Sequence, residues 1–266
     1  MGKVLGVIGC GKMAYALLKG MNIAGFDFER IFVCDIVKDQ EEAFVREFNA
    51  VAANHQDLVE NSDMILIAVK PNQVISVLEA TRMKWKKDKL LISIAAGIKT
   101  IDMEGAIQVE TPVIRVMPNT PSLVSQGLAA ISAGQFAREI DLRVVESMMN
   151  SVGESIIMEE NLINAVTAIS GSGPAYIYLV VESMIDAAIH VGFNSEIAKK
   201  LVLQTMKGSL AMVEQTGKHP AVLKQEVCSP AGTTIAAIKQ FEEDGIRKAF
   251  FNAVEKAYKR AQELSN

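Results

Sequence analysis

A glycine-rich turn near the start of the sequence has the residue types and spacing of a phosphate-binding loop. Residues 9–14 read Gly-Cys-Gly-Lys-Met-Ala and follow the apolar, β-branched run Val4–Ile8. Gly9 permits the tight turn, Gly11 lets backbone N–H groups approach a pyrophosphate, and the small Ala14 lets a helix pack on the strand. The helix dipole adds attraction for the anion. Such a turn after the first strand predicts a dinucleotide site.

An acidic residue, Asp35, ends the second predicted strand. It lies roughly 20 positions beyond the glycine-rich turn, where this motif places its ribose-binding carboxylate. The carboxylate can accept hydrogen bonds from both ribose hydroxyls and would repel a 2′-phosphate, so Asp35 favours NAD over NADP. The alternative is that Asp35 only starts a turn, helped by the nearby Lys38. NADP use therefore stays open.

Two further turns follow predicted strands and would lie on the same edge of a sheet. Residues 68–71 (Ala-Val-Lys-Pro) follow one buried run, and residues 95–97 (Ala-Ala-Gly) follow the next. In open α/β sheets ligands bind at the carboxyl ends of the strands, so both turns are expected to flank the cofactor. The alternative for Lys70 is a solvated charge before a helix-starting proline.

Two small-residue turns occur in the second half of the chain. Residues 170–174 (Ser-Gly-Ser-Gly-Pro) precede a long apolar helical pattern, and this spacing favours close helix packing over ligand binding. Residues 228–234 (Cys-Ser-Pro-Ala-Gly-Thr-Thr) also lead into a helical segment. Its free N–H groups, with the hydroxyls of Ser229, Thr233 and Thr234, would suit a carboxylate. The alternative there is an ordinary Ser/Thr helix cap.

The sequence contains few candidate side chains for conventional acid/base catalysis or metal binding. The histidines are separated and lie in polar or helix-end contexts: His55, His190 and His219. No set of His, Cys and carboxylate residues has metal-ligand spacing, so no metal centre is expected. The three scattered cysteines form no disulfide framework, and their odd number favours a reducing cytosol.

The hydrophobic pattern predicts an α/β protein with two domains. Short apolar runs alternate with amphipathic segments up to residue 160, which is typical of a Rossmann-type, doubly wound sheet. The predicted strands are 4–8, 31–35, 64–69, 90–94, 113–116, 128–132 and 155–158. Helical spacing follows, with segments at 175–192, 194–215, 235–241 and 246–264. We expect a dinucleotide-binding domain over 1–160 and an all-α domain over 161–266.

The composition excludes several classes of protein. The chain has 266 residues, with 27 Lys plus Arg against 31 Asp plus Glu, which is a formal net charge of −4. This balance offers no general attraction to nucleic acid or to anionic lipid. The apolar runs are shorter than the ~20 residues that span a bilayer, and the N-terminus lacks a secretion signal pattern. We expect a cytoplasmic protein with no nucleic-acid or membrane partner.

The sequence resembles the pyrroline-5-carboxylate reductases along essentially its whole length. Five blocks carry the resemblance: residues 6–14, 68–71, 115–121 (Arg-Val-Met-Pro-Asn-Thr-Pro), 170–176 (Ser-Gly-Ser-Gly-Pro-Ala-Tyr) and 228–234. The last three are the most specific. The resemblance implies reduction of the ring C=N bond of 1-pyrroline-5-carboxylate to L-proline by NADH or NADPH, the last step of proline synthesis. It also implies a homodimer through the helical domain, which can assemble further into a decamer.

The resemblance assigns residues to two sites. The implied cofactor residues are Ile8, Gly9, Cys10, Gly11, Lys12, Met13, Asp35, Asn54, Ala68, Val69, Lys70, Pro71, Ala95 and Ala96. The implied substrate residues are Glu160, Ser229, Gly232, Thr233 and Thr234. Thr234 is the catalytic candidate, because its hydroxyl would hydrogen-bond the imine nitrogen. A protonated imine is already electrophilic, so its reduction needs orientation more than a strong general acid.

Three departures from the family pattern and two rival functions bear on this interpretation. Ala231 replaces the first of two glycines common in the substrate loop, and Cys228 stands where Thr or Ser is usual. Asp35 replaces a small or hydroxyl residue found in many NADP-using relatives. A β-hydroxyacid dehydrogenase of the 6-phosphogluconate type needs a catalytic lysine on the first long helix of its second domain, and residues 176–191 contain none. A non-catalytic nucleotide sensor would not need Thr233 and Thr234.

Overall fold

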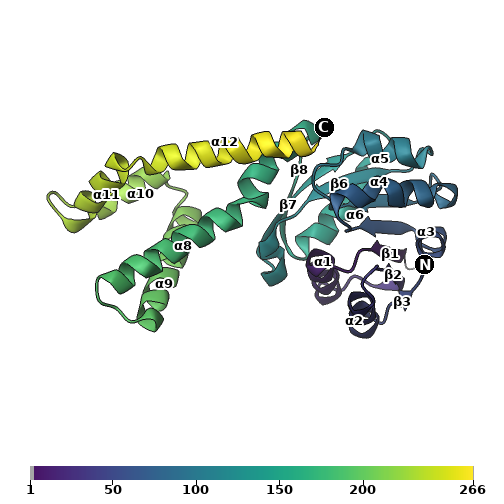
Figure 1. Ribbon diagram of the computed structural model, residues 1–266, viewed down its shortest axis with the longest axis horizontal. Coiled ribbons are helices and arrows are strands. Elements are labelled where there is room, and N and C mark those ends of the chain that lie inside the picture. The colour runs from purple at the N-terminus through teal and green to yellow at the C-terminus, as the bar shows by residue number, and fades with distance from the viewer. Residues whose placement is uncertain (1–2, 266) are drawn as a thin grey trace. The chain divides into compact units, whose positions relative to one another are not determined.

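The computed structural model describes residues 3–265, in which eight strands form one sheet (Figure 1). The strands are β1 (Lys3–Ile8), β2 (Phe28–Cys34), β3 (Val51–Ala52), β4 (Met64–Ile67), β5 (Leu90–Ser93), β6 (Val113–Met117), β7 (Gly127–Ala133) and β8 (Gly153–Ile157). Their order is β3-β2-β1-β4-β5-β6-β7-β8. Neighbouring strands are parallel except β6 and β7. The order reverses between β1 and β4, which creates a switch point for ligand binding.

Apolar runs form the central strands because both faces of the sheet are covered. In β4, Met64 and Leu66 belong to one buried cluster, whereas Ile65 and Ile67 belong to the other. Successive strand residues point to opposite faces, so a strand buried on both sides must be apolar throughout. The helices of this region are α1 (Lys12–Ile23), α2 (Lys38–Phe48), α3 (His55–Asn61), α4 (Pro71–Ala80), α5 (Thr100–Ile107), α6 (Glu139–Asn150) and α7 (Ile163–Val166).

Short turns of other helix types complete this region. Three are 3₁₀-helical, at Arg82–Lys84, Thr120–Val124 and Glu160–Leu162, and the segment Thr167–Gly171 is π-helical. The face with α1 and α6 holds one buried cluster, and the face with α3, α4 and α5 holds the other. This arrangement is a doubly wound sheet, which confirms the predicted fold class.

The second region is helical and buries few of its own side chains. Its helices are α8 (Gly173–His190), α9 (Ser195–Thr216), α10 (Pro220–Val227), α11 (Thr233–Glu243) and α12 (Ile246–Leu264). The contacts divide the chain into two compact units. Residues 173–256 form one unit, and the chain up to Ser172 forms the other together with the chain from Ala257 onward. The predicted boundary at residue 160 stays a prediction. None of the described helices is long and apolar enough to cross a membrane.

Two short elements differ from the predicted pattern. β3 was not predicted, because it is two residues long and exposed, so it lacks the apolar run that marks a buried strand. The predicted helical segment 194–215 corresponds to α9, which ends at Thr216 because Gly217 adopts a left-handed conformation. Pro220 then begins α10, because proline fits the first turn of a helix, where its missing N–H is not needed.

Candidate cofactor and substrate sites

The glycine-rich turn lies where three parallel strands end. Gly9 has φ +99°, a conformation that L side chains rarely adopt, and its N–H donates to the Cys34 carbonyl at 2.9 Å. A Cβ on Gly9 would lie 2.7 Å from the carbonyl carbon of Ala68 and 2.9 Å from the nitrogen of Val69. Glycine is therefore required both by the backbone conformation and by the close approach of the β4 end.

The N-terminus of α1 is open toward a ligand. Gly11 is the cap residue in an extended conformation, and no side chain caps the helix. A Cβ on Gly11 would meet no atom within 4 Å, so the space beside this turn is free of protein. The N–H groups of the first helical turn lack intrahelical acceptors, and the helix dipole favours an anion there. These features fit the pyrophosphate of a dinucleotide.

Asp35 is adjacent to the glycine-rich turn. One carboxylate oxygen, Oδ2, accepts from the Cys10 N–H at 2.6 Å, and Oδ1 accepts from the Val37 N–H at 2.7 Å. Asp35 thus does start a turn, as the alternative interpretation held, and it also supports the phosphate-binding loop. Burial, together with the negative charge of Asp35, raises the pKa of the Cys10 thiol to about 12. Cys10 is therefore protonated and unreactive at neutral pH.

The other predicted cofactor residues follow strands on the same edge of the sheet. Residues 68–71 come directly after β4, where Lys70 is the cap of α4 and Pro71 its first residue. Ala95 and Ala96 follow β5, and Ala95 is buried. Asn54 follows β3 and caps α3, because its Oδ1 accepts from the Asp57 N–H at 2.9 Å. Parallel strands place their carboxyl ends together, so these turns lie on one side of the sheet.

A buried ion pair lies beside the β5–α5 connection. The Glu160 carboxylate accepts from the Thr100 N–H at 2.8 Å, from the Thr100 hydroxyl at 2.6 Å and from Arg115 Nη1 at 3.0 Å. The Arg115 side chain is 3% exposed and that of Glu160 is 24% exposed. Among residues 3–265, Arg115 Nη2 and the Ser170 hydroxyl are buried without a partner. Glu160 therefore caps α5 and neutralises a buried cation.

The sequence interpretation gave no role to Arg115 or Thr100. The available signal was an arginine within the apolar run Val113–Val116, since a charge in a buried strand needs a counter-ion. In the turn at residues 170–174, the packing interpretation agrees with the surroundings of Gly171 but not with those of Gly173, where a Cβ would meet no atom within 4 Å. A Cβ on Gly171 would lie 2.8 Å from the terminal methyl carbon of Met117.

In the helical unit, the substrate candidates lie at the N-terminus of α11. Gly232 is the cap residue, no side chain caps the helix, and Thr233 and Thr234 are its first residues. The alternative of an ordinary Ser/Thr cap is therefore wrong. The turn is tight, because the Gly232 N–H donates to the Ser229 carbonyl at 3.1 Å and a Cβ on Gly232 would lie 2.2 Å from the Ser229 hydroxyl.

Ala231 shows how this loop differs from a two-glycine version. Its φ is +54°, in the left-handed region that favours glycine. An alanine there costs about 1 kcal/mol or more, which the rest of the loop must offset. Residue 231 thus has a backbone conformation that glycine adopts more easily than alanine.

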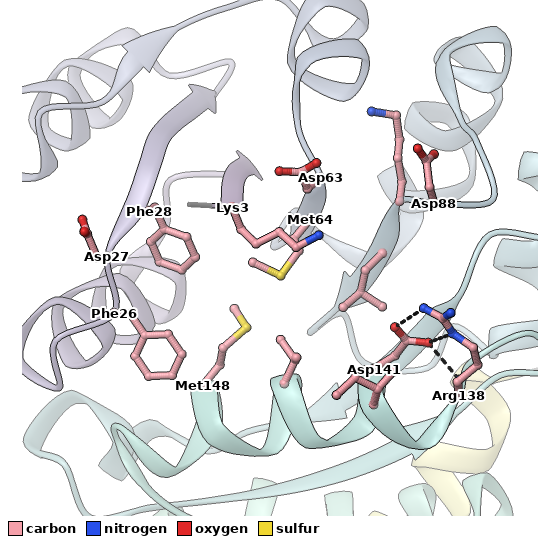
Figure 2. Close-up of a pocket in the computed structure, with 14 residues that line it drawn as sticks. Lys3, Phe26, Asp27, Phe28, Asp63, Met64, Asp88, Arg138, Asp141 and Met148 are labelled. Atoms are coloured by element: carbon pink, nitrogen blue, oxygen red, sulfur yellow. Dashed lines mark hydrogen bonds and ion pairs between the residues drawn. The ribbon is translucent and has the colours of Figure 1, made fainter. Parts of the chain in front are cut away.

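A pocket of about 360 Å³ lies at the amino ends of the strands, opposite the end at which the glycine-rich turn lies. Figure 2 shows Lys3 reaching into it, with Phe26, Phe28 and Met148 on one side and the Arg138–Asp141 ion pair on the other. The strand residues that line this pocket begin their strands, so the pocket is separate from the candidate cofactor site at the carboxyl ends. No set of three His, Cys, Asp or Glu side chains that could hold a metal occurs in the described part of the chain.

The doubly wound sheet and its uncapped glycine turn define a dinucleotide-binding oxidoreductase fold. Residues 4–97 match the family model described as NADP oxidoreductase, coenzyme F420-dependent. Residues 160–264 match the model described as pyrroline-5-carboxylate reductase dimerisation. The chain belongs to the pyrroline-5-carboxylate reductase family, which confirms the resemblance found in the sequence.

Individual relatives agree over the full length. The pyrroline-5-carboxylate reductase of Methanosarcina acetivorans is 40% identical, over 98% of this chain and 97% of that protein. The solved pyrroline-5-carboxylate reductase from Coxiella burnetii is 34% identical with a TM-score of 0.90, over 100% of both chains. That of Plasmodium falciparum, solved with NADP bound, is 33% identical with a TM-score of 0.90, over 99% of this chain and 98% of that chain.

Proposed function

We propose that this chain is a pyrroline-5-carboxylate reductase, which reduces 1-pyrroline-5-carboxylate to L-proline with a nicotinamide cofactor. The observation that carries the proposal is the loop at residues 228–234. This chain matches its relatives over nearly its full length, and the loop leads into an uncapped helix that begins with two threonines. A helix N-terminus with adjacent hydroxyls is suited to a carboxylate without an arginine. Reduced nicotinamide supplies the hydride when it is bound.

Within this function, the residues of the loop take different roles. The N–H groups and hydroxyls of Thr233 and Thr234, with Ser229 and Gly232, would hold the substrate carboxylate. The Thr234 hydroxyl would also hydrogen-bond the ring nitrogen and so orient the C=N bond. Glu160 lines the substrate site in this proposal, and its contacts with Thr100 and Arg115 support a positioning role. Orientation of this kind can supply much of the rate enhancement.

The function is tested by oxidation of NADH and of NADPH in the presence and absence of pyrroline-5-carboxylate. We expect substrate-dependent oxidation that Thr234→Ala lowers roughly 10- to 100-fold in kcat/KM, the effect of losing a hydrogen bond to a charged group. Thr234→Ser keeps the hydroxyl and should retain most of the activity. If the purified protein binds dinucleotide but shows no substrate-dependent oxidation with either cofactor, the sensor interpretation is favoured and the proposal is wrong.

The proposed cofactor site comprises the turns at the carboxyl ends of β1, β2, β4 and β5, with Asn54 after β3. Residues 8–13 would contact the pyrophosphate, and Asp35 the adenine ribose. Ala68 to Pro71 and Ala95 to Ala96 would flank the rest of the cofactor. The position of Asp35 beside the glycine-rich turn supports a preference for NADH over NADPH.

The preference is tested by replacing Asp35 with serine. Removing the carboxylate removes its repulsion of a 2′-phosphate, so the ratio of kcat/KM for NADPH to that for NADH should rise, by roughly tenfold for one surface charge. Steady-state kinetics with both cofactors gives the ratio. Glu42→Ser is the control, because it removes an exposed acidic residue of α2 that pairs with Arg46 at 3.7 Å. An unchanged ratio for Asp35→Ser contradicts the assignment.

The helical region supports a homodimer. Helices α8, α10 and α11 contain no buried residue, and large apolar side chains of this unit are exposed, among them Tyr178, Leu179, Leu210, Val227 and Phe251. Monomers rarely expose so much apolar surface without a partner. We propose that residues 161–266 form a domain distinct from residues 1–160 and that the dimer forms through this domain. We also propose that the dimers assemble further into a decamer and that the protein acts in the cytoplasm.

A further inference from the structure

We propose that Glu41 is a specificity-determining residue for the cofactor, because it holds Lys38 away from the 2′ position of the adenine ribose. The inference rests on the proposed function only through its use of a nicotinamide dinucleotide. Glu41 contacts no cofactor in this proposal. It acts through Asp35, which lies in the β2–α2 connection, and Lys38, the first residue of α2.

The contacts of Glu41 link the ribose-site acid to the adjacent cation. Its Oε1 pairs with Lys38 Nζ at 2.7 Å, and its Oε2 accepts from the Asp35 N–H at 3.1 Å. The Glu41 side chain is 7% exposed, whereas that of Lys38 is 73% exposed. The carboxylate is thus fixed in place from two directions, and the flexible lysine is drawn to it.

Without Glu41, the start of α2 would attract a phosphate. Lys38 is the first residue of the helix, and the cap residue Val37 provides no side-chain cap. An uncapped helix N-terminus with a lysine favours an anion. Three carboxylates oppose this attraction: Asp35 of the β2–α2 connection, and Asp39 and Glu41 of the first turn of α2. Glu41 is the one paired directly with the lysine, so it has the strongest effect on where the cation lies.

The ionisation of the pair agrees with this geometry. Burial by itself would raise the pKa of Glu41, but the hydrogen bonds from Lys38 and from the Asp35 N–H outweigh burial, and the pKa is lowered. The hydrogen bond to Glu41 raises the pKa of Lys38. Both groups are therefore charged at neutral pH, and a 2′-phosphate would have to compete with Glu41 for the ammonium group.

The test is Glu41→Gln, measured as the dissociation constants of NADPH and NADH from the full-length protein by reduced-nicotinamide fluorescence. Glutamine keeps an oxygen for the Asp35 N–H but releases Lys38. We expect the affinity for NADPH relative to NADH to rise roughly 5- to 20-fold, the size of one partly screened charge interaction. Adding Lys38→Met to Glu41→Gln should remove the gain, because it removes the released cation.

Glu42→Gln is the matched control. Glu42 is the next residue, carries the same charge and pairs with Arg46 at 3.7 Å, but both partners are exposed. The affinity of Glu42→Gln for NADPH relative to NADH should equal that of the natural protein. If Glu41→Gln leaves the NADPH to NADH ratio unchanged, or weakens both cofactors equally, Glu41 only stabilises the helix and the proposal is overturned.

A second variant and the choice of readout keep the proposal falsifiable. If Glu41→Gln does not fold, Glu41→Ala also removes the charge, and the same rise is expected and the same unchanged ratio overturns the proposal. Because the readout is dinucleotide binding, it is independent of turnover with pyrroline-5-carboxylate. A shifted ratio without such turnover would support the role of Glu41 and contradict the reductase function, so the two failures are distinguishable.

Discussion

Replacing Glu160 with glutamine is expected to lower the free energy of unfolding by about 3–5 kcal/mol, the usual cost of removing one partner of a buried ion pair. Glutamine can still accept from the Thr100 N–H, so the capping of α5 is retained in part. The cost arises at Arg115, whose side chain is 3% exposed and whose Nη2 is already without a partner in the described chain. Its charge would be left buried with no counter-ion beside it.

The origin of this cost is shown by a double-mutant cycle. Arg115→Met removes the stranded charge, so the double variant Arg115→Met/Glu160→Gln should recover a large part of the stability that Glu160→Gln loses. Urea unfolding at one fixed protein concentration measures the four free energies, since the stability of an oligomer depends on concentration. Glu159→Gln is the control, because Glu159 is the exposed neighbour. Strictly additive effects would contradict a direct charge pair.

Replacing Gly9 with alanine is expected to abolish measurable dinucleotide binding and to destabilise the fold by roughly 3 kcal/mol or more. Left-handed strain for a non-glycine residue accounts for about 1–3 kcal/mol of this. The new methyl would also lie 2.7 Å from the backbone carbonyl of Ala68, so β1 and β4 would have to separate at the switch point. Backbone atoms at the end of a buried strand cannot move aside as a flexible side chain can.

Gly11→Ala separates the effect on cofactor binding from the effect on stability. A methyl on Gly11 meets no protein atom within 4 Å, so this variant should keep its unfolding temperature. It should nevertheless bind NADH and NADPH more weakly, because the methyl occupies the space through which a pyrophosphate approaches the N–H groups. Thermal unfolding and cofactor titration of both variants give the comparison. Normal binding by Gly11→Ala would place the pyrophosphate elsewhere.

Patterns confined to one stretch of chain could be interpreted from the sequence. The glycine-rich turn, the apolar strands and the proline at the start of α4 are determined by neighbouring residues, through backbone sterics and side-chain periodicity. The predicted helix at 246–264 has the bounds of α12 for the same reason. The exposed two-residue strand β3 escaped prediction, because its pairing with β2 provides no hydrophobic signal.

The sequence by itself therefore determined the fold class, the family and the turns that carry the candidate sites. Only the tertiary structure decided which side chains meet across the chain. Arg115 and Glu160 are 45 positions apart, and Cys10 and Asp35 are 25 apart, so no local spacing connects them. Cys10 and Asp35 meet because they follow the paired strands β1 and β2, and Arg115 lies in β6, one strand away from β8, which Glu160 follows. The sheet thus brings a buried charge to its counter-ion and a carboxylate to the amide it must accept from.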